Sequence, residues 1–234
     1  MVARAAPRLT IAVAALLLAA SPARAQLGGS VSIASDNIWR GLSQSGGRPT
    51  LTLGGAYDHP SGVYLGGSAI VEDGDHSQLQ LLGFRENLGF AFRQGHDLSW
   101  DIGVDNEDWT QYGAARRGLH YSEVYAGVAA KGLAAHLYYS PDYVRPGYST
   151  LYAELSGSVR PADNWRLFAT AGALLYLTAP ASPVPATRYD ARIGVARALG
   201  PVELKLEGTA TTPRPSPQSG QTPESVVVSA SYFF

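Results

Sequence analysis

Residues 202–210, with the sequence VELKLEGTA, alternate strictly between two kinds of side chain. The even-numbered positions are apolar or glycine, and the odd-numbered positions carry charged or hydroxyl groups. Successive residues of a β-strand point to opposite faces, so this stretch predicts a strand with one apolar face and one polar face. Residues 188–195 (RYDARIGV) follow the same pattern.

The alternation recurs along the chain, interrupted by turn residues, and no segment beyond residue 25 keeps a capped helical period. The sequence therefore predicts an all-β protein. Twelve antiparallel strands are expected, at residues 29–40, 49–58, 62–72, 78–92, 97–107, 120–130, 133–142, 148–160, 165–177, 187–198, 201–212 and 224–234.

Short and long connections alternate between these strands. Tight turns such as residues 131–132 and 199–200 follow the even-numbered strands, and longer segments such as 108–119 and 213–223 follow most odd-numbered ones. Outer-membrane barrels show this alternation, with short periplasmic turns and longer extracellular loops. Lipid offers no hydrogen bonds to an open sheet edge, so the first and last strands are expected to pair and close a transmembrane β-barrel.

The first 25 residues have the features of a secretory signal peptide. Arg4 and Arg8 supply positive charge, residues 9–20 form a short apolar run, and Ala23-Arg-Ala25 is a small-residue cleavage site. Cleavage after Ala25 leaves residues 26–234 as one barrel domain. The predicted location is the bacterial outer membrane.

Composition excludes several classes of function. The 234 residues include no cysteine, and the formal net charge is −1. There is therefore no thiol nucleophile and no basic surface for nucleic acid. The five histidines are scattered without metal-ligand spacing, so we expect neither a metal site nor a cofactor.

Aromatic residues gather near the ends of the predicted strands. On the apolar faces they predict the two girdles at the membrane surfaces. The proposed girdle residues are Trp39, Tyr57, Trp100, Tyr139, Trp165 and Tyr189. The chain ends on a strand whose apolar face carries Tyr232 and Phe234, which resembles the C-terminal signal read by the barrel assembly machinery of bacteria.

One stretch carries a family resemblance. Residues 35–43, SDNIWRGLS, resemble the opening motif of the TorF-type porin family of bacterial outer-membrane barrels, in which Ser-Asp-aromatic leads to Arg-Gly-x-Ser. Asn37 stands where that family usually has an aromatic residue. The resemblance continues through residues 61–67, 121–127 and 139–143. It implies a porin-like barrel and brings no substrate and no functional residues.

The polar faces predict the lining of the lumen. Carboxylates concentrate on strands five to eight and basic groups on strands nine to eleven, which would place a field across the pore. Contact with solute is expected from Asp101, Asp105, Glu123, Glu154, Arg166, Arg188, Arg192 and Lys205. The predicted function is passive or weakly selective diffusion of small hydrophilic solutes.

Other readings remain open. Twelve strands lie between a filled barrel and a water-filled channel. Aromatic side chains on the polar faces and an internal Arg192–Glu207 ion pair would suit a plugged barrel that is structural or binds partners through its loops. His120 and Ser122 lie two residues apart on one face, the minimum for a lipid-acting hydrolase, but no orienting third group is evident. We therefore expect no enzyme. The expected partners are outer-membrane lipid and lipopolysaccharide, the assembly machinery and small solutes.

Overall fold

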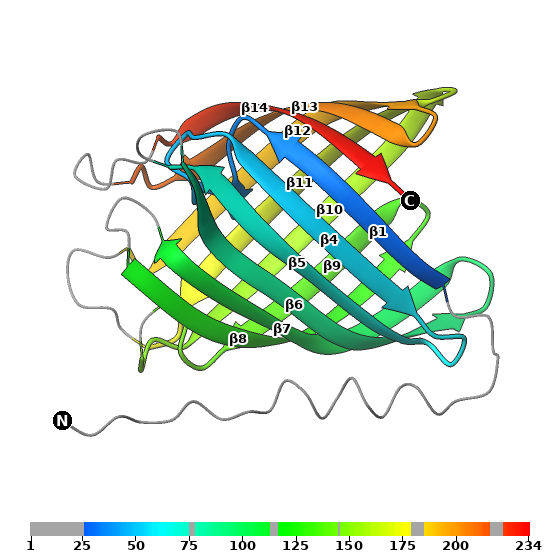
Figure 1. Ribbon diagram of the computed structural model, residues 1–234. Coiled ribbons are helices and arrows are strands. Elements are labelled where there is room, and N and C mark those ends of the chain that lie inside the picture. The colour runs from blue at the N-terminus through cyan, green and yellow to red at the C-terminus, as the bar shows by residue number, and fades with distance from the viewer. Residues whose placement is uncertain (1–25, 75–77, 113–116, 145, 179–184, 216–221) are drawn as a thin grey trace, which may run out of the picture.

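The computed structural model describes residues 26–74, 78–112, 117–144, 146–178, 185–215 and 222–234. The predicted signal peptide lies outside these residues. Twelve long strands form a closed antiparallel barrel, and two short strands form a separate hairpin (Figure 1). The strands are β1 (Gln26–Ala34), β2 (Ile38–Trp39), β3 (Leu42–Ser43), β4 (Thr50–Asp58), β5 (Val63–Asp73), β6 (Leu79–Gln94), β7 (Leu98–Tyr112), β8 (Arg117–Ala130), β9 (Leu133–Ser140), β10 (Thr150–Ala162), β11 (Trp165–Tyr176), β12 (Thr187–Leu199), β13 (Val202–Thr212) and β14 (Glu224–Phe233).

Each barrel strand pairs with its neighbours in sequence, and β1 pairs with both β4 and β14. The predicted closure between the first and last strands is confirmed. Two backbone hydrogen bonds extend the β1–β14 seam to the last residue: Gly29 N donates to Phe234 O at 2.8 Å, and Phe234 N donates to Gly29 O at 3.0 Å. No barrel strand is therefore left with an unpaired edge, the condition that lipid imposes.

The two ends of the barrel differ in their connections. At the end where β1 begins and β14 finishes, here called the turn end, the strands are joined by residues 59–62, 95–97, 131–132, 163–164 and 200–201. The opposite end, here called the loop end, carries the connections 35–49, 74–78, 113–116, 141–149, 177–186 and 213–223. The predicted alternation of short and long connections is confirmed for most of the strand pairs. The prediction of a long segment at residues 108–119 is wrong, because β7 continues to Tyr112 and β8 begins at Arg117, so that residues 113–116 alone join them.

The outer wall is apolar. Leu155, Ile193 and Val228 expose 57%, 68% and 59% of their surfaces, whereas polar residues on the same strands face inward. A soluble protein would bury such side chains, and lipid is the environment that suits this band. The described residues contain no helix that is long and apolar enough to cross a membrane.

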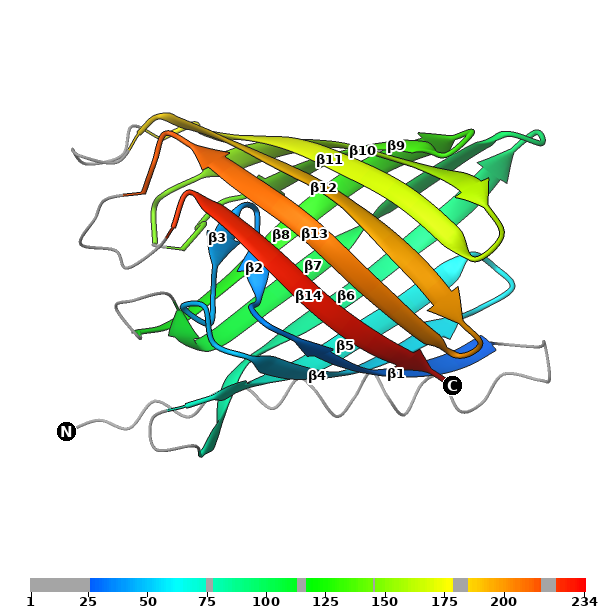
Figure 2. The same cartoon turned by 90° about the horizontal axis from the view of Figure 1, so that it is seen from above.

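The first predicted strand, residues 29–40, is too long at its C-terminal end. β1 ends at Ala34, and the chain then leaves the wall, forms β2 and β3 inside the barrel and returns at β4 (Figure 2). We call residues 35–49 the inward hairpin. The alternation of residues 35–40 therefore belongs to a segment that faces the lumen and not to a membrane span.

The seam offers a direct test of closure. A side chain at position 29 would overlap the ring of Phe234, whereas a Cβ at Gly28 would meet no atom within 4 Å. We expect Gly29→Leu to displace the ring of Phe234, which is 71% exposed and free to rotate, and to weaken the seam by about 1 kcal/mol, the lower end of the cost of overpacking, whereas Gly28→Leu should have little effect. The measurement is the urea midpoint of the refolded barrel, followed by heat-modifiable electrophoretic mobility. Equal midpoints for the two variants would contradict the role of the Phe234 contact.

Candidate functional site

The tip of the inward hairpin is a two-residue turn. Arg40 and Gly41 connect β2 to β3 with φ angles of 47° and 74°. Two successive positive φ angles are the signature of the type I′ turn that best fits tight β-hairpins. Gly41 also lies directly against the opposite wall, because a Cβ on it would be 2.7 Å from Asp190 Cβ and 2.9 Å from Thr211 Cβ.

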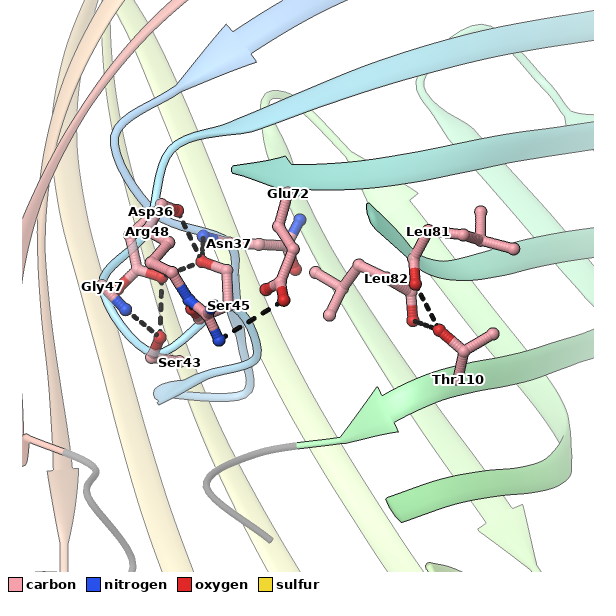
Figure 3. A network of polar contacts seen from close by, with 10 residues as sticks. All are labelled: Asp36, Asn37, Ser43, Ser45, Gly47, Arg48, Glu72, Leu81, Leu82 and Thr110. Carbon is pink, nitrogen blue, oxygen red and sulfur yellow. Dashed lines mark hydrogen bonds and ion pairs between the residues drawn. The ribbon is translucent and has the colours of Figure 1, made fainter. Parts of the chain in front are cut away.

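Polar contacts hold the base of the hairpin (Figure 3). Ser43 and Ser45 each donate a hydrogen bond from Oγ to Asp36 Oδ1 at 2.7 Å. Arg48 forms an ion pair with Glu72 of β5, with 3.4 Å between Nη2 and Oε1. Asp36 is 8% exposed, so its carboxylate organises the hairpin from within.

Arg40 carries the strongest contact between the hairpin and the wall. Its Nη1 and Nη2 donate to Oε1 and Oε2 of Glu123 on β8, at 2.9 and 2.6 Å. The two side chains are only 2% and 0% exposed. The guanidinium carbon lies 3.9 Å from the ring centroid of Tyr152, in the geometry of a cation–π contact. This bidentate pair is therefore fully shielded from water.

Trp39 adds a second contact with the wall. Its Nε1 donates a hydrogen bond to the hydroxyl of Tyr121 at 3.0 Å. The guanidinium carbon of Arg85 lies 3.7 Å from the centroid of its ring. Arg85 Nε in turn donates to Glu107 Oε1 at 2.9 Å. The prediction that Trp39 belongs to the membrane girdle is wrong, because the strand that would have placed it there ends five residues earlier.

The hairpin occupies the loop-end half of the lumen. It contacts β8 through Arg40, and its tip reaches β12 and β13. Wall side chains become buried around almost the whole ring, among them Thr50, Ile70, Leu82, Trp109, Tyr121, Thr150, Tyr152, Leu174, Thr209 and Val227. Within the described residues, the hairpin and these side chains fill the loop-end half of the lumen.

The turn-end half of the lumen is hollow. A cavity of about 570 Å³ lies among the inner faces of β6 to β12, with Arg93, Arg166, Phe168 and Arg192 in its lining. This volume lies in the range of small-molecule pockets. We call this space the vestibule.

The proposed solute-contact residues all lie on the inner face of the wall, but their surroundings differ. Glu123 forms an ion pair with Arg40, and its side chain is completely buried. It therefore cannot contact a solute while the hairpin is in place. Asp101 lies 3.3 Å from His136, and Arg166 forms an ion pair with Glu203. The remaining residues are half-buried at the inner surface: Asp105, Glu154, Arg188, Arg192 and Lys205. Contact with solute stays a prediction for all eight.

The other proposed girdle residues lie on the outer face. Trp100, Tyr139, Trp165 and Tyr189 are 39% to 54% exposed, and Tyr57 is half-buried near the turn end. At the C-terminus, the exposed rings of Tyr232 and Phe234 stack with 5.9 Å between their centroids.

The pair of His120 and Ser122 faces outward on β8. Asn106 and Asp108 of β7 lie directly opposite Ser122 and His120, neighbours that the sequence analysis did not identify. Ser122 Oγ donates to Asn106 Oδ1 at 2.9 Å, and no hydrogen bond joins Ser122 to His120 within the described residues. The arrangement therefore lacks the contact that activates a serine nucleophile.

Sequence reasoning missed the residues on which closure depends. No role was predicted for Arg40, Arg48 or Arg85, and no ion pair was predicted for their partners Glu72 and Glu107. Asp36 and Arg40 gave no warning, because in the predicted strand 29–40 they share the polar, lumen-facing side with Ser30 and Ser32. One signal was present on the other face: the positions in line with Val31 and Ile33 become polar at Ser35 and Asn37, which does not suit a lipid-facing surface.

Comparison with solved structures shows a shared fold. The barrel is similar to a membrane protein in a structure described as "Unveiling the Mechanism Behind the in-meso Crystallization of Membrane Proteins", with 10% identity and a TM-score of 0.52 over 89% of this chain and 83% of that one. It also matches LpxR from Salmonella typhimurium, with 11% identity and a TM-score of 0.47 over 88% and 99% of the chains. The trimer form of OmpT from Vibrio cholerae matches with 8% identity and a TM-score of 0.43 over 90% and 99%.

At these identities the likeness is one of fold: an all-β barrel like those of bacterial outer-membrane proteins. No curated protein sequence matches the chain. A family model does match, over residues 18–204. The chain therefore belongs to the family described as "Bacterial protein of unknown function (Gcw_chp)".

Proposed function

We propose that this protein is an outer-membrane channel for small hydrophilic solutes and that the inward hairpin is its gate. The observation that carries the proposal is the division of the lumen. The turn-end half is a polar vestibule. The loop-end half is occupied by a segment whose backbone joins the wall only at its two ends and whose other contacts with the wall are made by side chains. The finer resemblance to the TorF-type porins supports the same function.

The chemistry of the hairpin contacts favours a gate over a permanent plug. The main contacts are ion pairs and hydrogen bonds: Arg40 with Glu123, Trp39 with Tyr121, and Arg48 with Glu72. Well-packed apolar residues often stabilise the folded state as much as a buried ion pair does, or more. Water replaces polar contacts when the hairpin leaves, whereas it would not compensate for an exposed apolar plug.

The membrane and the assembly machinery complete the proposal. The apolar wall would contact outer-membrane lipid and lipopolysaccharide, with the loop end outside the cell and the turn end in the periplasm. Tyr232 and Phe234 would be read by the barrel assembly machinery. Transport of this kind is passive, so no catalytic step and no cofactor is involved.

A reversible disulfide tests the gate. The chain has no cysteine, and a Cβ at position 41 would lie 2.9 Å from Thr211 Cβ. A disulfide has a Cβ separation of about 3.8 Å, so a small shift permits the bond. We expect the double variant Gly41→Cys/Thr211→Cys to be silent in planar bilayers when oxidised. After reduction it should open as often as the Gly41→Cys single variant, whose new side chain by itself displaces the tip from Asp190 and Thr211.

Each single-cysteine variant serves as the control and should respond to neither reagent. An oxidised double variant that conducts like the wild type would show that the hairpin is not the gate. Correctly folded wild-type protein and reduced variant that both remain silent would favour the plugged, structural barrel.

A further inference from the structure

The vestibule is built by a single row of the β-sheet. Successive register pairs connect Arg93 to Ser99, Ala129, Ala134, Ser156, Thr170 and Arg192 across β6 to β12. The five side chains in the middle of the row are small, and the two at its ends are arginines. The cavity is therefore a hollow with a floor of methyl and hydroxyl groups and a guanidinium at each end.

The charge of this hollow is unbalanced. Its lining includes Arg93, Lys131, Arg166 and Arg192 but only one carboxylate, Asp97. Asp97 lies 3.8 Å from Lys131 at the exposed rim of the barrel. Arg166 is neutralised by Glu203, whose two oxygens lie 2.8 and 2.9 Å from Nη2. Arg93 and Arg192, at the two ends of the row, have no ion pair among the residues that the structure describes. The carboxylate of Asp190 interacts electrostatically with Arg192, but it lies one row nearer the loop end and outside the lining of the vestibule.

Arg192 stands out because no hydrogen bond or ion pair joins it to another residue in the described ranges. Its Nε is buried without an acceptor. The predicted partner, Glu207, binds Lys205 instead at 3.0 Å. A buried donor without an acceptor is unfavourable, and the planar fork of a guanidinium matches a carboxylate or a phosphate.

We propose that the vestibule binds small organic anions and that Arg192 holds their carboxylate or phosphate group. Thr170, opposite Arg192, supplies a hydroxyl, and Phe168 supplies an apolar surface beside it. The inference deepens the proposed function, on which its meaning for transport rests, because it names the class of solute that the channel would select.

Isothermal titration calorimetry in detergent at low ionic strength tests the site, with succinate and inorganic phosphate as probes. We expect the wild type to bind at least one probe and Arg192→Gln to bind it about tenfold more weakly or worse, as for the loss of one charged hydrogen-bond donor. Arg192→Lys, which keeps the charge but loses the fork, should fall between the two. Heat-modifiable mobility verifies that each variant is folded.

Arg197→Gln is the matched control. Arg197 lies on the same strand, faces outward and has its guanidinium carbon 5.1 Å from the ring centroid of Trp165, so the variant makes the same change in net charge outside the lumen. Equal weakening by Arg197→Gln and Arg192→Gln, or no wild-type binding of either probe, would overturn the inference. The vestibule opens at the turn end, so binding does not require the gate to move. If the protein shows no conductance in planar bilayers but still binds the probe, the proposed channel function is wrong and the anion site is retained.

Discussion

Replacing residues 36–48 by an Asn-Gly turn should convert the closed barrel into a permanently open one. Ala34 of β1 pairs with Thr50 of β4, so the two strands can be joined by a short hairpin without changing the register. The ring itself is closed by its own strand pairs. Removal of the hairpin leaves Glu123 and its neighbours facing a water-filled lumen, where ionised groups are stable.

The expected change is large. Breaking a buried ion pair costs about 3–5 kcal/mol, and each 1.4 kcal/mol is about a factor of ten in an equilibrium. If the Arg40–Glu123 pair holds the gate, the open population of the variant should exceed that of the wild type by on the order of 100-fold or more. The measurement is open probability in planar bilayers, with liposome swelling by small sugars as a second readout.

The matched control replaces residues 113–116, another loop-end connection, by an equally short turn. This variant should conduct like the wild type, because its change lies outside the inward hairpin. A folded deletion variant whose conductance equals that of the wild type would mean that the wall side chains, and not the hairpin, close the lumen.

The barrel could be predicted from the sequence because its signals are local. The alternation of apolar and polar side chains can be read from neighbouring residues. The alternation of short and long connections can be read from the order of the strands along the chain. The same signals misplace Trp39, because an inward hairpin also alternates. The contact that distinguishes the two cases, between Arg40 and Glu123, joins residues 83 positions apart.

The register between neighbouring strands is a second feature that could not be predicted from the sequence. The sequence analysis placed the last tight turn at residues 199–200, which would set Arg192 opposite Glu207. In the structure the turn is Gly200-Pro201, with Leu199 paired to Val202, so Arg192 faces Thr209. A shift of two residues keeps every side chain on its predicted face but changes every partner. Faces could therefore be predicted from the pattern, whereas ion pairs could not.

Arg40→Ala and Glu123→Ala should each open the gate, and the double substitution Arg40→Met/Glu123→Leu should close it again. Each single variant leaves a charge without its partner in a place that is at most 2% exposed, and departure of the hairpin returns that charge to water. The apolar pair removes both charges together and keeps the packing against the ring of Tyr152. Truncating one partner of a buried pair costs about 3–5 kcal/mol, whereas replacing the whole pair by apolar groups is often neutral.

Two measurements distinguish an effect on the hairpin from an effect on the stability of the barrel. Open probability should rise in both single variants and return toward the wild-type value in the double variant. The urea midpoint of the barrel should change far less, because the strand pairs of the ring do not include Arg40. Arg48→Ala is the comparison within the hairpin: its ion pair with Glu72 is longer, at 3.4 Å, and Arg48 is 30% exposed, so its loss should have a smaller effect. If the apolar double variant stays as open as the single ones, closure depends on the charge pair itself, and the gate responds to whatever competes for Arg40 or Glu123 in the lumen.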